Sequence, residues 1–272
     1  MNGNVITHPA RSIRLRYGAW SGRILEQSPL HAVFTSGAWP PDIEDPRHIH
    51  TLKRNPKVHS GLLTLEDRTQ YFFKRFTTPP LRRHLRRLVA QPRARANWRL
   101  SRQLERHGVP VARAQALATG PSESWFLAEA FADAVSLAKL SRKGLIDSVD
   151  LLETTQHLAE IISTMHRVGI IHGDLKWGNI LMPPSCGPII ADLDSARQVS
   201  RVSPARAAPD LARFLVSGLE QGLTASWADD ITRRYAEARG VDAEDLVSEV
   251  RPLVRKISRA HQRRYGRSSV DI

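Results

Sequence analysis

Short apolar runs bounded by polar turns mark the first half of the chain. Residues 62–65 and 71–76 are two such runs, and the polar turn 66–68 joins them. Residues 125–128 form a third run. Apolar runs of this length between turn residues are typical of buried strands, so this half is predicted to be rich in strands. Residues 1–50, rich in Gly, Pro and His, give weak signals and are predicted to be an irregular N-terminal extension.

Helical spacing of apolar residues is found between the strands and, more often, after them. Residues 93–107 are predicted to be a helix, because Gly108 and Pro110 follow them and end it. A longer helix of about five turns is predicted from apolar residues that share one face. These residues are Leu151, Leu158, Ile161, Ile162 and Met165.

The last helix and the change of pattern along the chain predict the architecture. Leu253 and Ile257 mark an apolar side of a C-terminal helix, and Pro252 is predicted to lie in its first turn, where proline is tolerated. A strand-rich first half before a helix-rich second half indicates an α+β fold. We expect a first domain over residues 1–128 and a second over residues 129–272.

The net charge of the chain indicates what kind of partner it binds. The 272-residue chain has 40 Lys and Arg residues against 27 Asp and Glu residues, which gives a formal net charge of +13. The excess is concentrated in residues 74–107 and 251–267, and part of the first zone, residues 81–88, is predicted to be a basic amphipathic helix. Such an excess indicates an anionic partner, which is nucleic acid, phosphate groups or an anionic membrane surface.

Composition excludes several classes of protein. The single cysteine, Cys186, excludes an internal disulfide framework and a cysteine-based zinc site. No apolar run approaches the roughly 18 residues of a spanning helix, and residues 1–10 lack the apolar core of a signal peptide. The basic residues 81–88 lack interleaved Phe and Tyr for base stacking. This absence counts against a binder of single-stranded nucleic acid. We expect a cytoplasmic protein and, with the chemistry described next, no nucleic-acid partner.

One pair of segments carries recognisable chemistry. Asp174, Lys176 and Asn179 follow one another at close spacing, and Asp192 comes after the apolar run 189–191. This pattern is typical of the metal–phosphate half of a kinase site, where catalysis needs charge neutralisation and in-line positioning. Asn179 and Asp192 are predicted to bind the Mg²⁺ that bridges the phosphates of ATP. Asp174 is predicted to accept the proton of the acceptor hydroxyl, and Lys176 to reach the transferring phosphoryl group.

The sequence HGDLKWGNIL at 172–181 resembles the catalytic loop of the protein-kinase-like superfamily. Together with YFFKRF at 71–76 and RARANWRLSRQLERHGVPVARAQAL at 93–117, it resembles bacterial lipopolysaccharide core kinases of the heptose and Kdo type, over about residues 50–215. The resemblance implies a two-lobed fold with a strand-rich N-lobe and a helical C-lobe. It also implies transfer of the γ-phosphate of ATP, with Mg²⁺ or Mn²⁺, to a sugar hydroxyl of the inner core.

The resemblance implies further roles for individual residues. Lys74, at the end of the second strand, would bind the α- and β-phosphates of ATP. Asn97 stands where the family carries the glutamate that pairs with this lysine, so it would hydrogen-bond Lys74 without adding charge. The segment from Glu129 to Phe131 would be the hinge whose backbone binds adenine. A glycine-rich phosphate loop is missing between residues 55 and 65, which leaves the backbone of that turn to cover the phosphates.

Other residues near the loop have structural interpretations. His172 is predicted to hold backbone by a hydrogen bond. Asp210 either hydrogen-bonds the catalytic-loop backbone from the next helix or complements the dipole at the start of that helix. Gly173 stands where many regulated protein kinases carry Arg, and Leu193 follows Asp192 where they carry Phe. These departures favour a kinase for sugars or small molecules over one for proteins.

The partners and the alternatives follow from these observations. The resemblance implies an anionic lipopolysaccharide or lipid A–core acceptor and peripheral contact with the inner membrane surface. A small-molecule phosphotransferase or a RIO-like serine/threonine protein kinase would use the same loop. A non-catalytic scaffold of the same fold is a further alternative, motivated by Asn97 and the missing glycine loop. The presence of Asp174, Asn179 and Asp192 argues against it.

Overall fold

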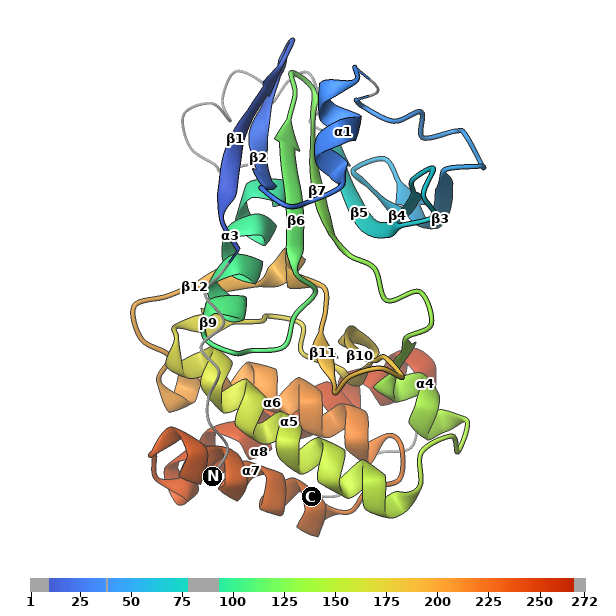
Figure 1. Cartoon of the computed structure of the whole chain (residues 1–272). Helices are drawn as coiled ribbons and strands as arrows, with labels where there is room; N and C mark the ends of the chain where they lie inside the picture. The colour runs from blue at the N-terminus through green and yellow to red at the C-terminus, as the bar shows by residue number, and fades with distance from the viewer. Residues whose placement is uncertain (1–9, 38, 78–92, 267–272) are drawn as a thin grey trace. The chain divides into compact units, whose positions relative to one another are not determined.

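The computed structural model describes residues 10–37, 39–77 and 93–266 (Figure 1). The chain divides into two compact units. The first, here the sheet unit, comprises residues up to Arg106 and Ala112–Ala132, and the second, the helical unit, comprises His107–Val111 and the residues from Asp133 onward. The predicted mixture of helix and sheet is confirmed. The predicted helix at residues 81–88 lies outside the described residues.

The sheet unit is built on one seven-stranded antiparallel sheet with the order β1-β2-β6-β7-β5-β4-β3. Its strands are β1 (Ser12–Tyr17), β2 (Trp20–Leu25), β3 (Ile49–Asn55), β4 (Val58–Thr64), β5 (Gln70–Thr77), β6 (Ala114–Thr119) and β7 (Glu123–Glu129). The three strands predicted from apolar runs are confirmed as parts of β4, β5 and β7.

Residues 12–35 add two strands to one edge of this sheet and a helix to one of its faces, so the prediction of an irregular extension is wrong for them. They form β1, β2 and the helix α1 (Leu30–Thr35). Leu15, Ile24 and Phe34 are buried in one cluster with Trp125 of β7. These strands are short and contain few apolar residues, so their pattern in the sequence is weak. Burial of the apolar residues depends on the neighbouring strands of the sheet.

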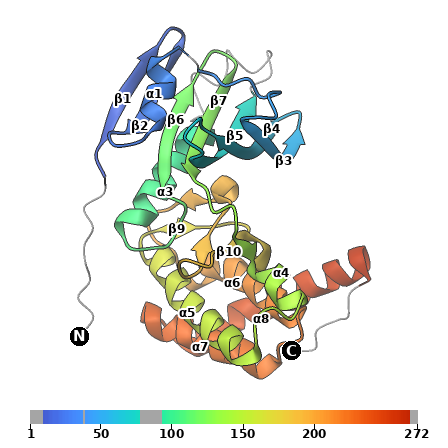
Figure 2. The ribbon, with the colours of Figure 1, turned by 45° about the vertical axis from the view of Figure 1, so that its right-hand side comes forward.

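The other face carries the helix α3 (Arg93–Arg106), which confirms the helix predicted over residues 93–107 (Figure 2). Ala94 and Trp98 of α3 pack with Phe76 of β5 and Phe126 of β7. Successive side chains of a strand point to opposite faces of the sheet. Lys74, two residues before Phe76, therefore lies on the α3 side.

The helical unit contains five described helices and several strands of two or three residues. The helices are α4 (Leu137–Arg142), α5 (Ser148–Arg167), α6 (Pro204–Leu219), α7 (Ala225–Arg239) and α8 (Ala243–Tyr265). The strands are β8 (Val135–Ser136), β9 (Ile170–Ile171), β10 (Ile180–Met182), β11 (Ile189–Ile190) and β12 (Arg197–Gln198). Helix α5 packs against α7, and α6 packs against α8, so the core of this unit is helical.

The start of α8 differs from the prediction. The helix begins at Ala243, where the Asp242 carboxylate accepts a hydrogen bond from the backbone N–H of Asp245, and Pro252 lies in its interior. This N-cap and the acidic first turn stabilise a start nine residues before the proline. A proline inside a helix removes a backbone donor, and the packing of α8 against α6 compensates. Leu253 and Ile257 are half-buried beside the fully buried Val254.

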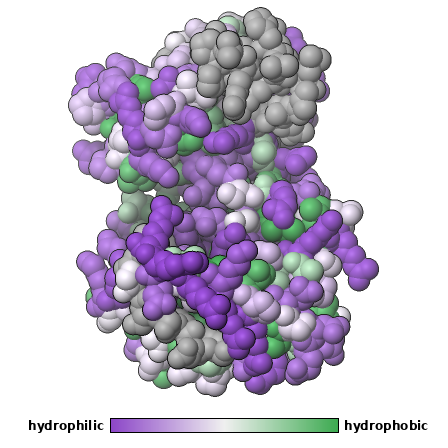
Figure 3. All heavy atoms as spheres, turned by 180° about the vertical axis from the view of Figure 1, so that it is seen from behind, coloured by the Kyte–Doolittle hydropathy of each residue, from purple (hydrophilic) through white to green (hydrophobic). Residues whose placement is uncertain are grey.

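The face of the molecule shown in Figure 3 is largely polar. On the face shown in Figure 3, hydrophobic residues form small spots between hydrophilic areas. Among the helices of the described ranges, none has the length and apolarity needed to span a bilayer.

Candidate active site

A short antiparallel hairpin brings the two chemical segments of the helical unit together. Ile180 of β10 pairs with Ile190 of β11, and the backbone N–H of Ala191 donates to the carbonyl of Asn179 at 2.9 Å. Residues just before β10 therefore lie beside residues just after β11. Asn179 and Asp192, the two predicted metal ligands, sit at this same end of the hairpin.

The loop around Asp174 is held by its own side chains. Lys176 Nζ donates to Asp174 Oδ2 at 2.8 Å, and Asn179 Nδ2 donates to both the carbonyl and the carboxylate of Asp174, at 2.8 and 3.0 Å. The side chains of Asp174 and Lys176 are 36% and 51% exposed, so a substrate can reach both. Because the amide nitrogen of Asn179 is used within the loop, its Oδ1 atom is left as the group that can bind a cation.

Asp192 adopts a left-handed backbone conformation, with φ 62° and ψ 66°. Residues other than glycine seldom adopt it, and Asp is one of the few that tolerate it. Such conformations are enriched at functional sites. The Asp192 side chain is exposed, and a 3₁₀ turn over Leu193–Ser195 follows it.

The donor set fits a magnesium ion. A carboxylate and an amide oxygen are hard ligands of the kind that Mg²⁺ prefers. Within residues 10–37, 39–77 and 93–266, no group of three or more His, Cys, Asp and Glu side chains is arranged to hold a metal by itself. Mg²⁺ usually takes one or two protein ligands and completes its shell with substrate phosphates and water. Asn179 and Asp192 would therefore hold the ion together with a nucleotide.

His172 links the catalytic loop to the end of β11, as predicted. Its Nε2 atom lies 3.0 Å from the carbonyl of Ala191, and its Nδ1 atom accepts from the backbone N–H of Asp174 at 3.3 Å. Burial lowers the pKa of His172. The neutral ring has one donor and one acceptor, which matches these two contacts.

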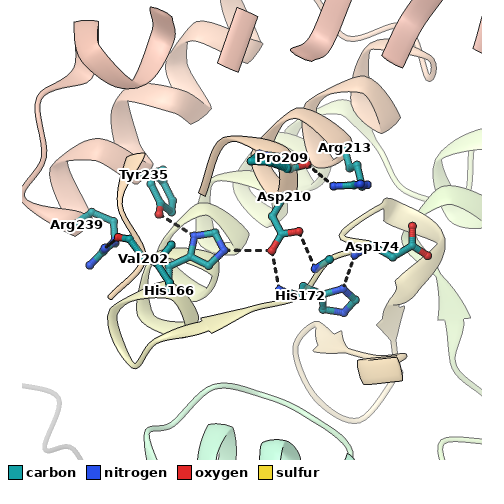
Figure 4. A network of polar contacts seen from close by, with 10 residues as sticks. His166, His172, Asp174, Val202, Pro209, Asp210, Arg213, Tyr235 and Arg239 are labelled. Atoms are coloured by element: carbon teal, nitrogen blue, oxygen red, sulfur yellow. Dashed lines mark hydrogen bonds and ion pairs between the residues drawn. The ribbon is translucent and has the colours of Figure 1, made fainter. Parts of the chain in front are cut away.

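Asp210 holds the backbone of the same loop from α6 (Figure 4). Its Oδ2 and Oδ1 atoms accept from the backbone N–H groups of His172 at 2.6 Å and Gly173 at 2.8 Å. Burial by itself raises the pKa of Asp210, but the hydrogen bond and charge of His166 and the further contacts lower it overall. The residue is fully buried inside α6 and not in its first turn. The first of the two predicted roles is confirmed.

A second buried histidine, which sequence reasoning missed, extends this network to α7. His166 Nε2 lies 3.3 Å from Asp210 Oδ2, and His166 Nδ1 lies 2.7 Å from the Tyr235 hydroxyl (Figure 4). Burial raises the pKa of Tyr235 to about 12, so its hydroxyl stays protonated, and the tautomer of His166 sets which of the two groups donates. The sequence signal for His166 is its position four residues after Ile162, on the buried face of α5. Nothing in the sequence indicates its partners.

Gly173 is required by the backbone. Its φ angle is +82°, and a Cβ atom added to it would lie 2.6 Å from the carbonyl oxygen of Ser195. A side chain of any size would collide with this oxygen. The local packing thus explains why a glycine stands here.

The sheet unit holds the residues predicted to bind the nucleotide phosphates. Lys74 is 8% exposed and lies on β5 between Ser60 of β4 and Phe126 of β7. Its Nζ atom is 6.0 Å from the centre of the Phe72 ring. Asn97 is 3% exposed on α3, which packs against β5 on this face. The structure therefore places Lys74 and Asn97 on the same side of the sheet.

The predicted hinge residues come at the end of β7. Glu129 is the last residue of the strand, pairs with Tyr71 and donates its backbone N–H to the carbonyl of Arg113 at 2.9 Å. Phe131 follows the strand and is half-buried. Since the Glu129 N–H is used inside the sheet, hydrogen bonds to a base would have to come from other backbone groups of this segment.

The turn between β3 and β4 occupies the place predicted for phosphate contact. The Asn55 side chain accepts hydrogen bonds from the backbone N–H groups of Lys57 and Val58, both at 2.9 Å. Pro56 has no N–H to donate. The N–H donors of residues 57 and 58 are therefore already used within the turn, and coverage of phosphate groups by this backbone stays a prediction.

Comparison with known proteins supplies the family. The model described as "Lipopolysaccharide kinase (Kdo/WaaP) family" matches residues 56–235, well over half of the chain. A search of curated proteins found no match. The matched segment contains Lys74, Asp174, Asn179 and Asp192. The chain therefore belongs to the Kdo/WaaP lipopolysaccharide kinase family, whose members are phosphotransferases that act on hydroxyl groups.

Proposed function

We propose that this protein is an ATP- and Mg²⁺-dependent kinase that phosphorylates a heptose or Kdo hydroxyl of the lipopolysaccharide inner core. The observation that carries the proposal is the Asp174–Lys176–Asn179 loop held beside Asp192 by the β10–β11 hairpin. Membership of the lipopolysaccharide kinase family supports the acceptor class. We further propose that the sheet unit and the helical unit are the N-lobe and C-lobe of a protein-kinase-like fold.

The partly exposed carboxylate of Asp174 supports its role as the proton acceptor. As the acceptor oxygen forms its bond to the γ-phosphorus, the bond from that phosphorus to the β–γ bridging oxygen breaks, and the hydroxyl proton passes to Asp174. Lys176, 2.8 Å from this carboxylate, is exposed enough to donate to the transferring phosphoryl group as well. Asn179 and Asp192 would hold Mg²⁺, which would neutralise phosphate charge.

Two neighbouring rows of side chains on the sheet unit support nucleotide binding. Leu62, Phe72 and Ala128 lie opposite one another on β4, β5 and β7, on the same face as Lys74. Leu62 and Phe72 are half-buried, so an apolar surface is available beside the lysine. Rows two residues apart along a strand are separated by about 6.6 Å. A nucleotide would place its base on the apolar row and its phosphates at Lys74.

The exposed face of α8 supports contact with an anionic membrane surface. Arg255, Lys256, Arg259 and Arg263 are all exposed, and at 3.6 residues per turn they lie within about 100° of arc. We call this set the α8 basic face. Each basic residue near an anionic bilayer contributes about 1 kcal/mol of attraction. Peripheral attachment at the cytoplasmic side of the inner membrane would bring the enzyme to a membrane-anchored acceptor.

The test uses two active-site variants. In a transfer assay with labelled ATP and a core oligosaccharide lacking the phosphate, Asp174→Asn should reduce the rate by about 10²–10⁴, the usual contribution of a general base. Asp192→Ala should abolish Mg²⁺-dependent transfer. Asp230→Asn, which removes an exposed carboxylate paired with Arg234 on α7, should leave transfer unchanged.

The outcome also separates the alternatives. Undiminished transfer in both active-site variants would overturn the proposed mechanism. Transfer to an aminoglycoside, choline or a protein, without transfer to the core sugar, would favour a small-molecule phosphotransferase or a RIO-like kinase instead. Loss of one phosphoryl group from the core of cells lacking the protein, seen by mass spectrometry, is the matching result in vivo.

A further inference from the structure

Lys53 stands in the same cross-strand row as Lys74. Lys53 of β3 pairs with Ser60 of β4, and Ser60 pairs with Lys74 of β5. Directly opposed residues of antiparallel strands point to the same face of the sheet. The row therefore carries two lysine side chains on either side of a buried serine, 7% exposed.

Contacts on the opposite face confirm this orientation. Arg54, the next residue along β3, forms an ion pair with Glu44 at 2.7 Å and pairs in register with His59. The His59 ring packs edge-on against Phe73, which belongs to the core cluster on the α1 side of the sheet. Since neighbours along a strand alternate between faces, Lys53 points to the α3 side, where Lys74 lies.

The distances in this row suit one phosphate group. Adjacent strands are about 4.8 Å apart, so the Cα atoms of Lys53 and Lys74 are separated by about 10 Å. The flexible four-carbon stem of a lysine allows both ammonium groups to reach an anion above Ser60. The Ser60 hydroxyl supplies a further donor.

The turn next to this row explains why side-chain donors are needed. In glycine-rich loops the backbone N–H groups cradle the phosphates. Here the N–H groups of Lys57 and Val58 donate to Asn55, and Pro56 has none. Phosphate binding at this hairpin therefore falls to cationic side chains of the strands that it joins.

We propose that Lys53 binds a phosphate group of the nucleotide together with Ser60 and Lys74, in place of the backbone donors of a glycine-rich loop. The inference rests on the proposed function, because it requires a nucleotide on this face of the sheet. In this proposal Lys53 contributes to the affinity for the polyphosphate chain of the nucleotide. Recognition of the base is left to the neighbouring apolar row.

Calorimetric titration of the full chain with ATP and with adenosine tests this assignment. Lys53→Gln should weaken ATP binding about tenfold, the loss expected for one hydrogen bond to a charged group, and leave adenosine binding unchanged. Lys53→Arg should stay within about threefold of the wild type, because it keeps the charge. Arg54→Gln is the matched control, since it removes the same charge one residue away on the opposite face, and it should bind ATP like the wild type.

Each contrary result overturns a stated part of the proposal. ATP binding by Lys53→Gln that equals the wild type overturns the inference and leaves the proposed function intact. Equal weakening in Lys53→Gln and Arg54→Gln also overturns it, because the effect would then come from net charge. A wild-type chain that binds no ATP overturns the proposed function and the inference together. Lys53 is exposed, and equal thermal unfolding midpoints of the variants would show that folding is preserved.

Discussion

Two residues of the candidate site have a backbone conformation that restricts which amino acids can stand there. Gly173 has φ +82° and faces the Ser195 carbonyl, and Asp192 has φ 62°. At Gly173 the selection is steric, because a Cβ atom does not fit. At Asp192 a side chain that can bind metal is kept although the conformation is unfavourable, which is typical of residues held for function.

Gly173→Ala should lower the free energy of unfolding by about 2 kcal/mol, because it combines a left-handed alanine with a collision against backbone. Urea unfolding measures the difference. Gly178→Ala is the matched control in the same loop, since the nearest atom to an added Cβ is 3.9 Å away and belongs to a flexible lysine. It should change stability by less than about 0.5 kcal/mol. Equal effects of the two substitutions would show that the Ser195 contact is unimportant.

The sequence predicts single residues well where the motif is local. Asp174, Lys176 and Asn179 lie within one loop, so their spacing alone indicates their proximity, and the 2.8–3.0 Å hydrogen bonds among them agree with that prediction. The His166–Tyr235 contact joins residues far apart on α5 and α7. It depends on how the helices pack, and no pattern along the chain contains that information.

At the level of whole elements, apolar periodicity predicts the long and strongly patterned ones. Helices α3 and α5 and strands β4, β5 and β7 follow directly from it. The β1–β2 hairpin was missed because six-residue strands with few apolar residues resemble loops. The start of α8 differs from the prediction because proline is usual in a first turn, which placed the start near Pro252. The N-cap that begins the helix, Asp242, is a weaker signal in the sequence.

The free energy of unfolding should fall at acidic pH because of buried groups around the catalytic loop. The folded-state pKa of His172 lies below the ordinary value of 6.5, so the unfolded chain binds more protons as the pH falls through this range. Stability from this group is present above about pH 6.5 and is lost as the pH falls toward its lowered pKa, with a slope of at most about 1.4 kcal/mol per pH unit. Asp210, whose pKa is also lowered, adds a loss of the same sign at still lower pH, below 3.8.

Urea unfolding at a series of pH values measures this dependence. His172→Gln can still donate to the Ala191 carbonyl but cannot be protonated, so its stability should fall less steeply below about pH 6.5 than that of the wild type. Parallel curves for the two proteins would contradict the assignment to His172.

For the molecule as a whole, the proposed function assigns part of the net charge of +13 to two local surfaces. The row of Lys53 and Lys74 and the α8 basic face lie in different units and have different proposed ligands. The first would act on the nucleotide and the second on the membrane surface. Substitutions should therefore separate nucleotide affinity from membrane affinity.

The double variant Lys256→Glu/Arg259→Glu should reduce binding to vesicles containing phosphatidylglycerol by at least about tenfold, because each residue contributes about 1 kcal/mol. Vesicle sedimentation at low and high salt measures the effect. The control Arg142→Glu/Lys143→Glu makes the same change of charge on exposed residues at the end of α4. An equal reduction in the control would assign the binding to net charge and not to α8.

The β1–β2 hairpin also limits which fragments of this chain can be expressed as folded proteins. It pairs with β6, and the family match begins only at residue 56, after β1, β2, α1 and β3. The match ends at residue 235, before α8, which covers α6. A fragment cut at the family limits would leave β6 and β4 as unpaired sheet edges and would uncover apolar core, a combination that favours aggregation. An expression fragment or a domain graft of this chain should therefore include residues 12–265.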